Sequence, residues 1–196
     1  MEHDPQYTIE LGDAHVRLRP WHDVDAGALV DAVRESVDSV GRWLPWCRAD
    51  YGRDAAEAWI AHCRAGWQAG NHFAFAVRSA GDDSLLGGVG LNQFEPIHRR
   101  ANLGYWVRQS RQRRGLATMA AQRVARFGFE QLGLIRIEIV ALPDNAASRA
   151  TALRIGARLE SIARQRLLVE GQPRDAAVYG LLRSDLTRAP AISACA

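Results

Sequence analysis

The stretch LGYWVRQSRQRRGLATMAAQRVARFGF, residues 103–129, decides the fold that this chain is expected to adopt. Its first five residues, Leu103 to Val107, form an apolar run that is typical of a buried strand. An arginine-rich loop follows, and apolar residues at helical spacing then predict a long amphipathic helix from about Gly115 to Leu132. A strand that leads through such a loop into a long helix is typical of layered proteins that mix helices and sheet.

Strands and helices also alternate on both sides of this stretch, and 41–53 forms an aromatic loop. Strands are predicted at 15–19, 73–78, 85–94, 101–107, 135–141, 157–169 and 176–182. Helices are predicted at about 23–40, 54–69, 115–132 and 145–155, with Asp23, Asp25 and Asp54 as N-cap candidates. Gly87 to Gly90 falls inside a strand, where a bulge or close packing is expected. The order of elements predicts a mixed α/β (α+β) layered fold.

The composition fits one globular domain, which we expect to span residues 8–186, with loose termini at 1–7 and 187–196. The chain has 196 residues, of which 47% are hydrophobic and 24% charged. No run approaches the roughly 20 apolar residues that a membrane helix needs, and the polar start is unlike a signal peptide. Cys47, Cys63 and Cys195 are scattered, which predicts free thiols in a reducing cytoplasm.

All 25 basic residues are arginine. Mechanisms that use a catalytic lysine are therefore excluded. The six histidines show no metal-ligand spacing, so no metal site is expected. A net charge of +3 gives little support for a nucleic-acid partner.

The start of the long helix is unusually basic. No acid occurs from Val107 until Glu130, and the arginines of this segment's first part are Arg108, Arg111, Arg113 and Arg114. Cations at the positive end of a helix dipole are unfavourable unless an anion lies there. Gly115 would let backbone N–H groups approach a phosphate closely. A solvated basic loop, or contact with a nucleic acid, would also account for these charges, although no interleaved aromatic residues support the second.

Two motifs resemble the GNAT superfamily of acyl-CoA N-acyltransferases. QRRGLA at 112–117 resembles the family's (Gln/Arg)-x-x-Gly-x-(Gly/Ala) loop, and it lies between a strand and a helix. NAAS at 145–148 resembles the family's Asn-x-x-Ser motif. The Gly156-Ala157 pair that follows has alanine where the family usually has phenylalanine.

Further segments resemble the RimJ/RimL branch, whose members acetylate protein N-termini, including those of ribosomal proteins. These segments are GYW at 104–106, WLPW at 43–46, GLN at 90–92 and the ending from Arg174 to Leu182. The resemblance covers about residues 8–186. It implies a GNAT-type, mostly antiparallel twisted sheet of about seven strands, with a splayed pair at the middle and about four flanking helices.

The resemblance also implies acetyl-CoA as co-substrate, without a metal. Loop amides would hold its pyrophosphate, and its pantetheine arm would lie beside a strand that a bulge separates from the next one. The amide of Val107 or a near neighbour would polarise the thioester carbonyl. The residues implied in binding acetyl-CoA are Trp106, Val107, Gln112, Arg113, Arg114, Gly115, Leu116, Ala117, Thr118, Asn145 and Ser148.

Three residues are implied in catalysis. Asn145 and Ser148 share a helix face, so Asn145 would bind the pantetheine and Ser148 would donate to the sulfur. The alternative is that they are only the N-cap and a first-turn residue. The tyrosine acid of many relatives is replaced by Ala152. Glu160 would be the base, or else a surface residue of its strand.

The acceptor is expected to be a primary amine that attacks directly in a ternary complex. A protein α-amine, with a pKa of about 7.7–8.0, needs less help to become neutral than lysine at about 10.4. Trp43, Trp46, Asn92 and Glu160 are the predicted acceptor-binding residues. The alternatives are a small-molecule amine (aminoglycoside, polyamine or amino acid) or a non-catalytic acyl-CoA-binding regulator. A homodimer is possible, and neither a nucleic-acid nor a membrane partner is expected.

Overall fold

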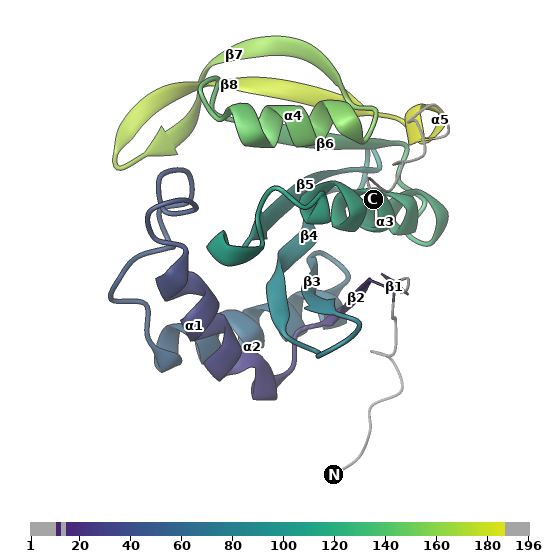
Figure 1. The fold of residues 1–196 in the computed structure, drawn as a ribbon. Coiled ribbons are helices and arrows are strands. Elements are labelled where there is room, and N and C mark those ends of the chain that lie inside the picture. Colours follow the sequence, from purple (N-terminus) through teal and green to yellow (C-terminus); the bar gives the residue numbers. More distant parts are fainter. Residues whose placement is uncertain (1–10, 13–14, 187–196) are drawn as a thin grey trace.

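A computed structural model describes residues 11–12 and 15–186 of the chain (Figure 1). The predicted loose termini and Cys195 lie outside these residues. The elements follow the predicted order closely: β1 Leu11–Gly12, β2 Val16–Pro20, α1 Ala26–Glu35, α2 Arg53–Ala69, β3 Phe73–Ser79, β4 Leu85–Glu95, β5 Arg100–Val107, α3 Leu116–Glu130, β6 Arg136–Ala141, α4 Ala146–Arg154, β7 Arg158–Val169, β8 Gln172–Leu181 and α5 Arg183–Leu186.

The strands form one sheet in the order β1-β2-β3-β4-β5-β6-β8-β7, and every pairing is antiparallel except that of β5 with β6. The two-residue β1 accounts for the one strand beyond the predicted seven. The parallel pairing ends at Asn102 and Glu138, after which β5 and β6 separate. The predicted mixed fold with a splayed central pair is thus confirmed.

Two hydrophobic cores lie on opposite faces of the sheet. Helix α3 packs on β4 and β5, while α1 and α2 pack on β3 and β4. Figure 1 shows α4, β6, β7 and β8 in the upper part of the molecule, α1, α2 and β1–β4 in the lower part, and α3 with β5 between them. Because strand side chains alternate, Leu103 and Tyr105 of β5 contribute to the α3 core, whereas Trp106 packs against the α1–α2 core.

The glycine run of β4 serves a bulge and close packing, as predicted. Pairing shifts from Val77↔Gly87 to Arg78↔Leu85, which leaves one residue of β4 unpaired. A Cβ at Gly88 would lie 2.6 Å from the indole nitrogen of Trp106.

A second register shift of β4 separates its pairs Asn92↔Asn102 and Glu95↔Arg100. Two residues of β4 here oppose Ala101 alone, and Gln93 has a φ of 50°. The bulge near the splayed pair therefore lies on β4, and not on the strand that leaves β6.

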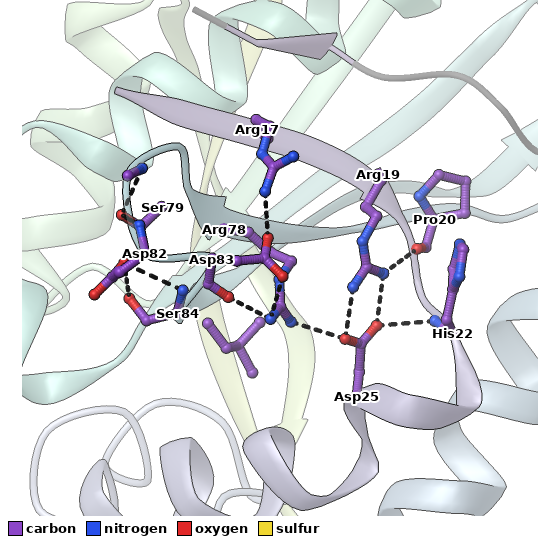
Figure 2. A network of polar contacts seen from close by, with 12 residues as sticks. Arg17, Arg19, Pro20, His22, Asp25, Arg78, Ser79, Asp82, Asp83 and Ser84 are labelled. Carbon is purple, nitrogen blue, oxygen red and sulfur yellow. Dashed lines mark hydrogen bonds and ion pairs between the residues drawn. The ribbon is translucent and has the colours of Figure 1, made fainter. Parts of the chain in front are cut away.

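The first helix is shorter than predicted, because Asp23 to Asp25 form a 3₁₀ turn and α1 ends at Glu35. The carboxylate of Asp25 is only 1% exposed and links three segments (Figure 2). It accepts hydrogen bonds from Arg19 at 2.7 and 2.8 Å, from Arg78 at 2.8 Å and from the His22 N–H at 2.9 Å. This network attaches the start of α1 to β2 and β3.

The second helix is capped by Gly52, so Asp54 lies in its first turn and is not the N-cap. Its acidic charge still complements the positive end of the helix dipole.

Replacing Asp25 by asparagine should destabilise the fold by about 3 kcal/mol, because removing one partner of a buried ion pair leaves the other charge uncompensated. The urea midpoint of unfolding measures the loss. Asp31→Asn, on the exposed side of α1, is the control and should change stability by less than about 0.5 kcal/mol. Equal midpoints for the two variants would contradict a structural role for the Asp25 network.

Candidate active site

The backbone of β5 presents an open edge where it leaves β6. The Arg108 N–H donates to the Leu86 carbonyl at 2.9 Å, which continues the ladder between β5 and β4. In an antiparallel ladder, alternate residues bond to the partner strand and the others point away. By this alternation the N–H and C=O groups of Trp106 face β4. Those of Tyr105 and Val107 face the side from which β6 has departed, and so does the Leu103 C=O, whereas the Leu103 N–H still belongs to the last bridge with β6, Asn102↔Glu138. We call these three residues the open edge of β5.

The open edge can therefore pair with an extended ligand, as an added strand would. The prediction that Trp106 offers its backbone to a ligand does not fit this register, whereas the prediction for Val107 does. The Val107 carbonyl already accepts a hydrogen bond at 3.0 Å from the side chain of Gln112. Its N–H is the group that remains for a ligand.

The start of α3 exposes a run of backbone N–H groups. Arg113 and Gly115 have φ values of 63° and 75°, and the helix has no side-chain cap. The first bond of the helix runs from the Met119 N–H to the Gly115 carbonyl. Within the described residues, the N–H groups of 113–118 have no protein acceptor. A Cβ at Gly115 would have no atom within 4 Å. N–H groups without an acceptor at the start of a helix suit an anion.

Gln112 differs from the rest of this predicted loop. Its N–H donates to the Gln109 carbonyl at 3.3 Å, and its side-chain amide also reaches Ser39 at 3.2 Å. Together with the bond to the Val107 carbonyl, these contacts fix the conformation of the loop, so Gln112 has a structural role here.

Glu35, at the end of α1, is a residue that sequence reasoning missed. Its carboxylate accepts from Arg108 Nε at 3.0 Å and from the Ser110 N–H at 2.7 Å. The hydrogen bond from Arg108 lowers the pKa of Glu35 to about 2. Arg108 is thus paired with an acid from a distant part of the sequence, which a count of acids along the local segment could not reveal.

Ser36, the residue after Glu35, also holds the loop that follows β5, because its hydroxyl accepts from the Gln109 N–H at 3.0 Å. Arg111, Arg113 and Arg114 form no ion pair with any described residue. Three cations therefore remain beside the open amides.

The start of α4 faces the open edge from across the separation. Asn145 Oδ1 accepts from the Ser148 N–H at 3.1 Å, so this side chain caps the helix, as one of the two sequence interpretations held. The Tyr105 hydroxyl donates to the Ser148 carbonyl at 2.9 Å and lies 3.3 Å from Ser148 Oγ. Burial raises the pKa of Tyr105 to about 12.

Glu160 is exposed and fully engaged by a neighbour. Arg136 donates to both of its carboxylate oxygens, at 2.8 Å for the Nη1–Oε1 contact. The hydrogen bond from Arg136 lowers the pKa of Glu160, which weakens it as a base. This geometry does not fit the predicted base role.

A cleft of about 350 Å³ lies beside the last paired residues of β5 and β6, next to the bulge of β4. Its lining residues are Gln93, Phe94, Glu95, Pro96, Arg100, Ala101, Asn102, Glu138 and Arg166. Asn92 lies at its margin, where its side-chain oxygen accepts from Asn102 at 3.0 Å.

Glu138 is the second residue that sequence reasoning missed. Its Oε1 accepts from Arg100 at 3.3 Å and from Arg136 at 3.1 Å. No described residue bonds its Oε2. In the sequence Glu138 showed only the alternation expected of a strand's polar face.

The predicted acceptor tryptophans lie elsewhere. Trp46 is 40% exposed and contacts the Trp106 ring edge-on at 5.6 Å. Trp43 lies beneath the Arg42 guanidinium at 5.4 Å. Neither side chain lines the cleft at the separation.

Cys47 and Cys63 are buried free thiols, and burial raises the pKa of Cys63 to about 12. In the described part of the chain, no group of three or more His, Cys, Asp or Glu side chains is arranged to hold a metal ion. None of the helices there combines the length and apolar character that crossing a membrane requires.

Known proteins are similar to this chain in sequence and in architecture. The family profile described as "Acetyltransferase (GNAT) domain" matches residues 15–158. YdaF of Bacillus subtilis (strain 168) is 29% identical over 180 residues, which cover 91% of this chain and 97% of YdaF. The [ribosomal protein uS5]-alanine N-acetyltransferase of Escherichia coli (strain K12) is 27% identical over 192 residues, covering 91% of this chain and 93% of that enzyme.

A solved structure agrees. RimJ of Mycobacterium smegmatis, in complex with CoA-disulfide, matches with a TM-score of 0.80 and 26% identity, over 93% of this chain and 91% of RimJ. The family profile alone spans well over half of the 196 residues. This chain therefore belongs to the GNAT acetyltransferase family, and it resembles the RimJ/RimL branch over most of its length.

Proposed function

We propose that this protein is an acetyl-CoA-dependent N-acetyltransferase whose acceptor is the N-terminal α-amine of a protein, with ribosomal proteins as the acceptor class. The run of free N–H groups at 113–118 beside the open edge of β5 is the observation that carries the proposal. Relatives support the acceptor class, since the Escherichia coli relative is named for alanine of ribosomal protein uS5.

The residues present fit acetyl-CoA, which supplies an acetyl group activated as a thioester. The amides of 113–118, with Arg111, Arg113 and Arg114 close in sequence, would hold its pyrophosphate. The open edge of β5 would hold the pantetheine arm through main-chain hydrogen bonds. The structure of the RimJ relative contains CoA, which supports the same ligand here.

The reaction joins the neutral amine nitrogen to the acetyl carbon while the carbon–sulfur bond breaks. The amine gives up one proton and the thiolate takes one, so the products are an amide and a free thiol. N–H groups of the open edge, that of Val107 above all, would stabilise charge on the carbonyl oxygen, where one donor is worth about 10²–10³ in rate. The Ser148 hydroxyl would donate a hydrogen bond to the departing sulfur.

Glu138 is the carboxylate best placed to take the amine proton through a water molecule. It lines the cleft at the point where β5 and β6 separate, and its Oε2 is free of described partners. Glu160, by contrast, has both oxygens bonded by Arg136.

Three further expectations remain proposals beside this function. They are one domain over 8–186, a cytoplasmic location and a homodimer. A small-molecule amine as acceptor, or acyl-CoA binding without turnover, are the alternative functions, and the first experiment below separates them from the proposal.

Purified protein supplied with acetyl-CoA should release CoA thiol when given peptides with free N-termini, and mass spectrometry should place the acetyl group on the α-amine. Peptides whose N-terminus is blocked but which contain lysine should give no product, because lysine is harder to deprotonate. Turnover on polyamines or aminoglycosides alone would favour a small-molecule acceptor. Tight binding without turnover on any amine would favour a non-catalytic role.

Gly115→Glu should raise the Kd for acetyl-CoA at least about tenfold, because it places a carboxylate beside amides that bind an anion. Isothermal titration measures the affinity. Gly133→Glu is a matched control near the other end of α3, since Gly133 also has a positive φ of 64° and no atom within 4 Å of the position that a Cβ would take. A similar loss of affinity in both variants would show that the effect comes from backbone strain.

Glu138→Gln should lower kcat about 10²-fold or more while leaving the Kd for acetyl-CoA nearly unchanged, as removal of a general base does. Steady-state kinetics with an N-terminal peptide measure the change. Glu160→Gln discriminates between the two carboxylates, because Glu160 and Glu138 both pair with Arg136 and each variant removes one negative charge beside it. A large loss for Glu160→Gln with none for Glu138→Gln would restore Glu160 as the base.

A further inference from the structure

Tyr105 makes a polar contact across the separated part of β5 and β6. Tyr105 lies in the middle of the open edge, and its side chain reaches the first turn of α4. Among the described residues, the side-chain hydrogen bonds that join the stretch 103–118 to β6, α4, β7 or β8 are those between Tyr105 and Ser148. The tyrosine thus connects the two walls of the proposed pantetheine site.

The geometry of this contact favours one arrangement of the two hydroxyl protons. The Tyr105 hydroxyl has one proton and donates it to the Ser148 carbonyl at 2.9 Å. The Ser148 hydroxyl, 3.3 Å away, then donates its own proton to the Tyr105 oxygen. No other described residue is hydrogen-bonded to Ser148 Oγ, so Tyr105 is the protein group that orients this hydroxyl.

No other described side chain on or beneath α4 is hydrogen-bonded to Ser148 Oγ, and the buried Thr151 hydroxyl donates to the Ala147 carbonyl. Ala152, one turn further along the helix, is 0% exposed and belongs to the core. Asn145 is occupied with capping the Ser148 N–H. Tyr179, the other tyrosine beneath α4, accepts from Arg149 at 3.0 Å and does not reach Ser148.

We propose that Tyr105 is the positioning residue for Ser148. Its hydroxyl holds Ser148 Oγ on the α4 side of the separation of β5 from β6. The serine then needs only a small rotation to donate to the departing sulfur. The main-chain groups of Tyr105 contribute to the open edge, while its side chain orients the donor on the opposite wall. The inference rests on the proposed N-acetyltransferase function.

A double-mutant cycle tests the inference. Tyr105→Phe in the wild-type background should lower kcat about tenfold and change the KM for acetyl-CoA less than about twofold, because the hydroxyl acts on the donor and not on cofactor binding. In the Ser148→Ala background, the same substitution should lower kcat by less than about twofold, since neighbouring residues that act as a unit are not additive. Each kcat is referred to the concentration of acetyl-CoA-binding sites from isothermal titration, so that an unfolded fraction does not count as slow enzyme.

Tyr179→Phe is the matched control, because it removes a buried hydroxyl that also contacts the first turn of α4. It should leave kcat within about twofold of wild type in both backgrounds. Equal losses from Tyr105→Phe in the two backgrounds, or no loss in either, would overturn the inference. So would a rise in the KM for acetyl-CoA without a change in kcat.

The outcomes also distinguish failure of the positioning role of Tyr105 from failure of the proposed N-acetyltransferase function. A wild-type protein that turns over no amine would remove the proposed function itself. Loss of activity in Ser148→Ala, with additive behaviour of Tyr105→Phe, would remove only the positioning role. Full activity in Ser148→Ala would remove the serine and its tyrosine from the mechanism and leave the acetyltransferase function standing.

Discussion

The separation of β5 from β6 after Asn102 and Glu138 is the constraint on which the whole site depends. Main-chain N–H and C=O groups are obligatory hydrogen-bonding groups, and one left buried without a partner costs about 1–3 kcal/mol. The central strand of this sheet nevertheless turns the C=O of Leu103, both main-chain groups of Tyr105 and the N–H of Val107 toward the separation. An extended ligand that carries amides of its own satisfies them, so an apparent defect in the sheet becomes a binding surface.

Side-chain contacts hold this surface in place, and among the described residues the Val107 carbonyl is the one main-chain group of the surface that they use. Glu35 and Ser36 fix the loop after β5 through the N–H groups of Ser110 and Gln109. Gln112 fixes the Val107 carbonyl, and Tyr105 ties the strand to α4. None of these contacts involves the amides of 113–118. The arrangement keeps the anion site ready before a ligand arrives, which reduces the entropy lost on binding.

The sequence predicted the parts of the site that depend on neighbouring residues. Gly115 with its flanking arginines is a local pattern, and so is the capping of α4 by Asn145, so both could be interpreted from a few consecutive positions. Apolar periodicity likewise gave most strands and helices to within a few residues. The end of α1 was misplaced. Asp25 does stand at the N-cap of α1, as predicted, but its carboxylate bonds Arg19 and Arg78 and caps no amide of the helix.

The remaining parts depend on pairs of residues that are distant in the chain, for which one sequence holds no signal. Arg108 was one of four arginines in a segment without acids, and α1 supplies Glu35 as its partner. Glu160 lies on the predicted strand, but Arg136 of β6 lies close enough to bond both of its oxygens.

The pairing of Arg136 with Glu160 also affects which carboxylate can act as a base. Glu95, Arg100, Glu138, Arg136 and Glu160 form one continuous row of ion pairs at the separation of the strands. Arginine stays charged at every working pH, so it cannot release its carboxylate partners by losing a proton. The hydrogen bond with Glu160 raises the pKa of Arg136 further, and that with Arg136 lowers the pKa of Glu160. The row therefore commits both oxygens of Glu160 to Arg136. Glu95 and Glu138 each keep one oxygen without a described partner at the cleft, and Glu138, on the strand that leaves β5, is the one proposed to take the proton of an incoming amine.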